Sequence, residues 1–224
     1  MAHLRVAKVN DSLQPSFAVE IHVVFGQVIM DEAAQAAAIT EVCRLHHARE
    51  VRVARDDRER DLVWKGRKNA FGALGRLSPS YYVQDGVIPR TRLPETLRCI
   101  ENVAHKYDLQ IGNIFHAGDG NLHPLILFDQ RDAAQFQRVV AASGEIMRHC
   151  VAVGGALTGE HGVGMEKNEL MPLMFTPDDL ALMERVRGVF NPTGRLNSGK
   201  VLPMGKGCGE IRVRPAPATT AVPT

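Results

Sequence analysis

The sequence predicts an α+β protein in which helices pack on one face of an antiparallel β-sheet and a helical segment follows near the C-terminus. Three observations support this class. Short β-branched stretches alternate between apolar and polar residues, and longer stretches repeat apolar residues at helical spacing. In addition, two of the strands are joined by the short turn Ala-Gly-Asp-Gly, which indicates a hairpin.

The N-terminal part predicts a split β-α-β unit of the ferredoxin-like kind. Residues 1–17 show no clear period and are expected to form an irregular lead-in. Residues 17–25 alternate and predict a strand, while the alanine-rich stretch 31–47 predicts a helix. A short strand is expected at 51–54, so a strand, a helix and a second strand follow one another within a length typical of this unit.

The middle of the chain continues the alternation of strands and helices. A helix is expected to begin at Asp56 or Asp57, either of which can cap it, and to extend to about residue 74. An interrupted strand follows at 81–89. The next helix is expected at 93–106, with a proline near its first turn, where proline loses no needed hydrogen bond.

The C-terminal half predicts the hairpin and two further helices. Strands at 110–115 and 122–128 flank the Ala-Gly-Asp-Gly turn, and an amphipathic helix at 132–153 ends at a pair of glycines. The last helix begins after Thr176, which is followed by a proline and two acids, and it ends near Phe190. Together these elements predict one domain over residues 18–203 and a disordered tail over 204–224, where Gly, Pro, Ala and Thr are frequent.

Composition and charge exclude several classes of function. The chain has 224 residues, of which 45% are hydrophobic and 23% charged, as in an ordinary globular protein. A net charge of +2, scattered basic residues, three Tyr and one Trp give no basis for nucleic-acid binding. No apolar run approaches the roughly 20 residues of a membrane span, and we recognise no signal peptide. Four widely spaced cysteines without a Cys-x-x-Cys pair fit a reducing cytoplasm.

Two glycine-rich segments, 114–124 and 154–164, contain residues that can bind a divalent metal. If His116 pairs near Asn121, then His123 lies on the same face of the hairpin and the two imidazoles can share one ion. Glu160 would supply a third protein ligand. Coordination positions of the metal would then remain open, as in catalytic rather than structural metal sites. The alternative is that these are surface or hydrogen-bonded histidines that bind no metal.

Three other residues near these segments allow more than one interpretation. Asp119 is expected either to orient a ligand histidine or simply to cap the turn. His161 follows the proposed ligand Glu160, and neighbouring side chains diverge, so it can face a substrate. Arg67, on the face of an expected helix, is either a solvated charge or a clamp for a substrate carboxylate.

Five ordered segments resemble a known family, namely 67–76 (RKNAFGALGR), 81–90 (YYVQDGVIPR), 113–129 (NIFHAGDGNLHPLILFD), 154–164 (GGALTGEHGVG) and 191–200 (NPTGRLNSGK). They resemble the C-terminal, substrate-binding (cap) half of FAD-linked 2-hydroxyacid dehydrogenases of the vanillyl-alcohol-oxidase type. Within that family the likeness is greatest to the FAD-binding subunits of bacterial glycolate oxidases. The resemblance is strong over about residues 60–203.

The resemblance implies a role for each matching position. It implies zinc, iron or manganese ligands at His116, His123 and Glu160. His161 resembles the general base that takes the proton from the substrate hydroxyl as a hydride leaves Cα. Arg67 resembles the carboxylate clamp, and Asn197 resembles a residue near the flavin ring. The family's usual proline at position 198 is Ser here, which changes the turn but removes no reactive group.

The resemblance also implies FAD, which this family binds mainly through an N-terminal domain. No Gly-x-Gly-x-x-Gly follows a strand in this sequence. We therefore expect the isolated chain to bind a metal and a small 2-hydroxy acid, glycolate or D-lactate, but to lack a hydride acceptor. A flavin domain or other oxidase subunits, an iron–sulfur subunit among the candidates, would complete a cytoplasmic enzyme, either free or held at the inner membrane by those subunits.

Two other functions remain open on the sequence alone. A stand-alone zinc hydrolase could use the two histidines and the glutamate to activate water, with His161 as the spare imidazole. A non-catalytic remnant could use the fold only for assembly. The ordered set of flavoenzyme segments favours the dehydrogenase.

Overall fold

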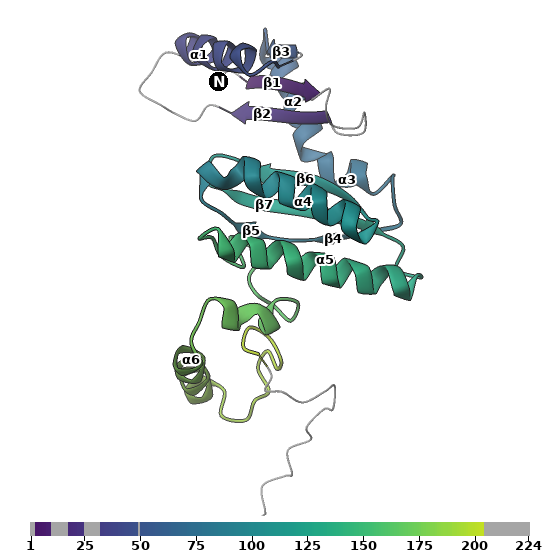
Figure 1. The fold of residues 1–224 in the computed structure, drawn as a ribbon. Helices are drawn as coiled ribbons and strands as arrows, with labels where there is room; N and C mark the ends of the chain where they lie inside the picture. Colours follow the sequence, from purple (N-terminus) through teal and green to yellow (C-terminus); the bar gives the residue numbers. More distant parts are fainter. Residues whose placement is uncertain (1–2, 10–17, 25–31, 49, 204–224) are drawn as a thin grey trace, which may run out of the picture. The chain divides into compact units, whose positions relative to one another are not determined.

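The computed structural model describes residues 3–9, 18–24, 32–48 and 50–203 (Figure 1). By its internal contacts the chain divides into two compact units, Met1–Leu77 and Ser78–Thr224, where the sequence predicted a single domain over 18–203. The expected disordered tail at 204–224 lies outside the described residues. The α+β class is confirmed, because each unit combines an antiparallel sheet with helices.

The first unit contains the split β-α-β arrangement. Its strands are β1 (His3–Val9), β2 (Ala18–Val24) and β3 (Glu50–Val53), in the order β2-β1-β3, and α1 (Glu32–Leu45) connects β2 to β3. Because β1 runs antiparallel to both neighbours, β2 and β3 are parallel to each other with β1 between them.

The predicted irregular lead-in is therefore wrong for residues 3–9, which form the central strand β1, and its remainder at 10–17 lies outside the described residues. The alternation of apolar residues in this short stretch is too weak to reveal a strand. What makes it one is pairing on both sides: Leu4 is in register with Val23 of β2 and with Val53 of β3. A local pattern does not show such partners, whereas the split topology requires them.

The helix expected from Asp56 or Asp57 to about residue 74 is two helices, α2 (Asp57–Lys68) and α3 (Ala70–Leu74). The Asp56 carboxylate accepts the Glu59 N–H at 2.7 Å and so caps the start of α2. Glu59 in turn accepts the backbone N–H of Arg55 at 2.8 Å and side-chain N–H groups of Arg52. These hydrogen bonds, the Arg55 backbone bond foremost, lower the pKa of Glu59 to about 2 and tie β3 to α2.

The second unit is built on a sheet with β7 (Asn121–Phe128) at its centre. β6 (Gln110–His116) pairs along one edge of β7, while β4 (Ser80–Val83) and β5 (Gly86–Val87) pair along the other, all antiparallel. All eight residues of β7 are buried. The hairpin predicted at 110–115 and 122–128 is therefore confirmed, as is the interrupted strand at 81–89.

The two faces of this sheet have different neighbours. Helices α4 (Leu93–Tyr107) and α5 (Ala133–Ala152) pack on one face, where they enclose the hydrophobic core (Figure 1). The core side chains from the sheet include Ile111, Leu122 and Ile126. Because side chains alternate along a strand, Asn121 and His123 of β7 point to the opposite face. The residues of the predicted site on β7 therefore lie on the face opposite to the one that α4 and α5 cover.

The interruption between β4 and β5 lies opposite a proline. Continuing the register from Val83↔Leu125 to Gly86↔Leu122 places Gln84 opposite Pro124 and Asp85 opposite His123. Pro124 has a carbonyl, which accepts the Gln84 N–H at 2.9 Å, but it has no N–H to return. The ladder therefore lacks one bond at this point, and Asp85 lies on the same face as His123.

The rest of the unit is helical. A 3-10 helix, η1 (Arg90–Arg92), precedes α4, and a second, η2 (Asn168–Leu173), was not predicted. The last predicted helix is confirmed as α6 (Pro177–Phe190), which Thr176 and Asp179 start with a reciprocal capping box. In the part of the chain that the structure describes, no helix combines the length and the apolar character that crossing a membrane requires.

Candidate metal centre

The first part of the site is the β6–β7 hairpin. His116 is in register with Asn121 across a turn over residues 117–120, as the sequence predicted. Gly120 has φ +80°, and a Cβ there would lie 2.1 Å from the carbonyl oxygen of Ile88, so glycine is required. With this register the rings of His116 and His123 lie on one face, with centroids 5.5 Å apart and planes at 88°.

The second part of the site is the segment after α5. It first runs beside β5, where Val87 and Ala156 exchange both backbone hydrogen bonds at 3.0 and 2.9 Å. The approach is so close that a Cβ on Gly155 would lie 1.8 Å from the Val87 oxygen. Beyond this bridge, residues 158–162 form a loop, called here the 158–162 loop, which brings Glu160 and His161 to the histidines of the hairpin.

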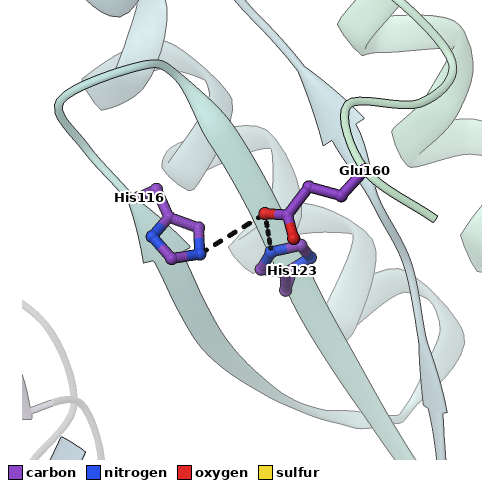
Figure 2. A group of neighbouring side chains, drawn as sticks. All are labelled: His116, His123 and Glu160. Carbon is purple, nitrogen blue, oxygen red and sulfur yellow. Dashed lines mark hydrogen bonds and ion pairs between the residues drawn. The ribbon is translucent and has the colours of Figure 1, made fainter.

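The side chains converge as the sequence predicted (Figure 2). Glu160 Oε1 lies 3.4 Å from His116 Nε2 and 3.2 Å from His123 Nε2, and one ligand atom from each of the three residues lies within 4.8 Å of the others. The His161 ring stacks on the His123 ring, with centroids 5.0 Å apart and planes at 14°. Glu160 also accepts a hydrogen bond from Asn121 Nδ2 at 2.5 Å.

This donor set fits a divalent transition metal. Two imidazole nitrogens and a carboxylate oxygen are ligands that zinc, iron and manganese accept. His123 is nearly buried, with a 4% exposed side chain, while His116 and Glu160 are 45% and 49% exposed, so the open side could admit further ligands. One feature departs from common metal sites: His123 Nδ1 is buried without a hydrogen-bond partner among the described residues.

Asp85 binds the backbone of the 158–162 loop through its carboxylate. Its carboxylate is 1% exposed and accepts three consecutive backbone N–H groups, those of Gly159, Glu160 and His161, at 3.0 to 3.2 Å from Oδ2. It also accepts the Thr158 hydroxyl at 2.5 Å. Burial acts to raise the pKa of Asp85, but these hydrogen bonds and the charge of Lys167 outweigh it, so the pKa is lowered overall.

Lys167 is the buried partner of Asp85. Its side chain is 4% exposed, and Nζ lies 3.7 Å from Asp85 Oδ2 and donates to the Asp85 carbonyl at 2.6 Å. Burial lowers the pKa of Lys167, and the negative charge of Asp85 offsets part of that shift. The ammonium therefore secures both the carboxylate and the backbone of Asp85.

Three further residues were singled out in the sequence, and the structure describes them to different extents. Asp119 accepts the Asn121 N–H at 3.2 Å, so it caps the turn, one of the two predicted roles. Asn197 lies after α6 with φ +47°, and its side-chain oxygen is 3.5 Å from Lys200 Nζ. Arg67 belongs to α2 in the first unit, and its side chain lies outside the described set.

An open cleft of about 310 Å³ borders His161. Residues 162–167 line it together with Val83 and Lys200. The chain after α6 is tied to this rim, because Val201 donates its N–H to the Gly164 carbonyl at 2.7 Å. The ionisable residues in the lining of the cleft are thus His161, Glu166, Lys167 and Lys200.

Sequence reasoning missed Asp85, Thr158 and Lys167. A signal for Asp85 was present, because an acid in the middle of an apolar strand pattern is costly unless it has partners. It was interpreted only as an interruption of the strand. No comparable signal marks Lys167, whose neighbours in sequence, Glu166 and Asn168, are also polar.

Comparison with known proteins gives the family. The profile of the family described as FAD linked oxidases, C-terminal domain, matches residues 8–201 and so spans both units. Glycolate oxidase subunit GlcD of Escherichia coli is 48% identical over 164 residues, which is 73% of this chain and 33% of that protein. The Bacillus subtilis protein of the same name is 34% identical over 163 residues, or 73% of this chain and 35% of that protein.

A relative with a different name points to the same family. The protein named probable D-lactate dehydrogenase, mitochondrial, of Danio rerio is 33% identical over 175 residues, covering 75% of this chain and 34% of that protein. The chain thus spans about a third of the length of each of these relatives. With a profile match over most of its length, the chain belongs to the family of FAD-linked oxidase C-terminal domains.

Proposed function

We propose that this chain is the substrate- and metal-binding half of a flavin-dependent 2-hydroxyacid dehydrogenase that acts on glycolate or D-lactate. The observation that carries the proposal is the convergence of His116, His123 and Glu160, with His161 stacked beside them. The names of the relatives, a glycolate oxidase subunit and a D-lactate dehydrogenase, support the substrate class.

In this proposal each residue of the cluster has a distinct task. His116, His123 and Glu160 would hold a divalent cation, which when bound supplies a Lewis acid for the substrate's hydroxyl oxygen. His161 would accept the hydroxyl proton. Stacking on His123 and the hydrogen bond from its own backbone N–H to Asp85 restrict where its imidazole can lie, as a general base requires.

The 158–162 loop does not fit the phosphates of FAD. The glycine-rich 158–162 loop is the place where backbone N–H groups gather, but those of Gly159, Glu160 and His161 already bind the Asp85 carboxylate. We therefore propose that the flavin, which accepts the hydride from Cα in this class of reaction, is bound mainly outside the described residues. A flavin domain or another oxidase subunit would carry it, an iron–sulfur subunit is a further candidate partner, and the E. coli relative is named as a subunit.

The remaining parts of the proposal rest on the resemblance. Arg67 would bind the substrate carboxylate through its planar guanidinium, and Asn197 would lie near the flavin ring. We place the assembled enzyme in the cytoplasm, with attachment to the inner membrane through partner subunits as the alternative. Activity with glycolate against D-lactate, measured on the assembled enzyme with a dye acceptor, would separate the two substrates.

The experiment that tests the metal site uses the purified full chain and isothermal titration with Mn²⁺ and Zn²⁺. We expect one ion per chain, and Glu160→Gln should weaken binding by more than the roughly 10–100-fold that loss of a supporting residue costs. The matched control is Glu169→Gln, an exposed acid of η2, which should bind as the wild type does.

Substrate binding is tested on the same samples. Glycolate or D-lactate should bind the wild type in the presence of the metal, whereas Glu160→Gln at the same metal concentration should bind neither acid. Equal metal affinity in the wild type and Glu160→Gln would contradict the proposal. Ester or amide hydrolysis by the metal-loaded chain without flavin would favour a hydrolase instead.

A further inference from the structure

We infer that Asp85 is a positioning residue: it fixes the 158–162 loop on β7, so that Glu160 and His161 meet the two histidines of the hairpin. The inference rests on the proposed function, because it assigns Asp85 a task in building the metal site. The sequence motifs that predicted the cluster assign no role to Asp85.

The contacts of Asp85 span the whole loop. Oδ2 accepts the N–H groups of Gly159, Glu160 and His161 at 3.0, 3.2 and 3.0 Å. The Thr158 hydroxyl donates to the same oxygen at 2.5 Å and accepts the Gly162 N–H at 2.8 Å. Five consecutive residues are therefore organised, directly or through one hydroxyl, around a single carboxylate.

Asp85 is itself attached to the strand that carries His123. Val83 and Gly86 on either side of it pair with β7, and Gln84 donates its N–H to the Pro124 carbonyl at 2.9 Å. The register places Asp85 opposite His123. The carboxylate thus connects two segments of the cluster that are far apart in sequence, and no other described contact fixes so many backbone groups of the loop.

A different role would also explain a buried aspartate, namely neutralising Lys167. Its ammonium lies 3.7 Å from Asp85 Oδ2, and a buried charge without a partner is costly. The two roles make different predictions when Lys167 is removed. If Asp85 only neutralises Lys167, then loss of both charges restores the site. If Asp85 positions the loop, loss of both restores stability but not the geometry of the site.

The test compares the full chain as wild type, Lys167→Met, Asp85→Asn and the double variant Asp85→Asn/Lys167→Met. Three properties are measured on each: the melting temperature, the affinity and visible spectrum of bound Co²⁺, and hydrogen exchange of the amides in residues 158–162. Lys167→Met keeps the Asp85 carboxylate and its hydrogen bonds to the loop, so its Co²⁺ affinity and spectrum should stay closer to those of the wild type than the double variant's do. The double variant should melt above Asp85→Asn, yet bind Co²⁺ about tenfold or more weakly, with a changed spectrum.

Hydrogen exchange separates this inference from the proposed function. In the double variant the amides of Gly159, Glu160 and His161 should lose protection while those of β7 keep it. Co²⁺ binding and loop protection equal to those of Lys167→Met would overturn the positioning role. A wild type that binds no Co²⁺ would defeat the proposed metal site, but the exchange of the loop amides would still decide whether Asp85 fixes the loop.

Discussion

Two carboxylates meet at the 158–162 loop, and their surroundings differ. Asp85 binds the backbone of the loop, whereas Glu160 belongs to the loop and points toward the histidines of the hairpin (Figure 2). Asp85 is 1% exposed and receives hydrogen bonds from three backbone amides and a hydroxyl, with an ammonium nearby. Glu160 is half exposed and has two imidazoles and one amide group around it.

This difference supports a structural role for Asp85 and agrees with the ligand role proposed for Glu160. A carboxylate whose lone pairs already accept several N–H and O–H groups has little capacity left for a cation. A carboxylate that shares an open space with two imidazole nitrogens retains that capacity. The residue type alone does not separate the two cases, because the partners of each acid come from distant segments.

Removing Lys167 is expected to have the largest effect on stability. Lys167→Met leaves the Asp85 charge buried without its ion-pair partner, which typically costs about 3 kcal/mol of unfolding free energy. Chemical denaturation measures the change. The control is Lys106→Met, which breaks the exposed ion pair to Glu145, 2.6 Å long, and should leave the midpoint almost unchanged. Equal losses in the two variants would remove the distinction between buried and exposed pairs.

The second largest effect on stability is expected from acidification, which protonates Asp85. The pKa of Asp85 is below its ordinary value of 3.8, because hydrogen bonds and Lys167 outweigh the effect of burial, which alone would raise it. Its stabilising contribution is therefore fully present above pH 3.8 and is lost as the pH falls through the lower folded value.

The measurement is urea unfolding between about pH 5 and pH 2, where one such group adds a slope of at most about 1.4 kcal/mol per pH unit. The wild type should lose stability more steeply below pH 3.8 than Asp85→Asn/Lys167→Met, which has no titrating group at that position. Parallel curves for the two proteins would show that Asp85 does not contribute in this way.

The smallest of the three effects is expected from the Thr158 hydroxyl. Thr158→Val keeps the shape of the side chain but removes the donor to Asp85 and the acceptor for the Gly162 N–H. The expected loss is about 1 kcal/mol of unfolding free energy, with weaker protection of the Gly162 amide in hydrogen exchange. Thr193→Val, at an exposed position after α6, is the matched control, and a comparable loss there would argue against a specific role for Thr158.

Much of the fold could be predicted because its signals are local. The helices α1, α4, α5 and α6 follow from apolar spacing and capping residues, and the β6–β7 hairpin follows from its turn. The register expected from that turn is the observed one, and it places His116 and His123 on one face. Their meeting with Glu160 also agrees with the prediction, since both segments are rich in glycine and allow close approach.

The features that could not be predicted depend on contacts between distant segments. β1 has a weak pattern and becomes a strand by pairing on both sides, and the break between α2 and α3 at Asn69 has no proline to mark it. Asp85 appeared only as an irregular point in a strand, because its donors lie more than 70 residues further along the chain. The roles of Arg67 and Asn197 stay predictions.

The length of the turn between β6 and β7 has a consequence for any attempt to modify this protein. With residues 117–120 between the strands, His116 faces Asn121, and the chain then needs two more steps to return to the same side with His123. Side chains alternate between the two faces of a strand, so one residue inserted or deleted between Asn121 and His123 would turn the His123 side chain to the other face. The imidazole would then lie among the core side chains that α4 and α5 cover. The proposed metal site should therefore depend more on the number of residues between His116 and His123 than on residue type at turn positions other than Gly120, where only glycine fits.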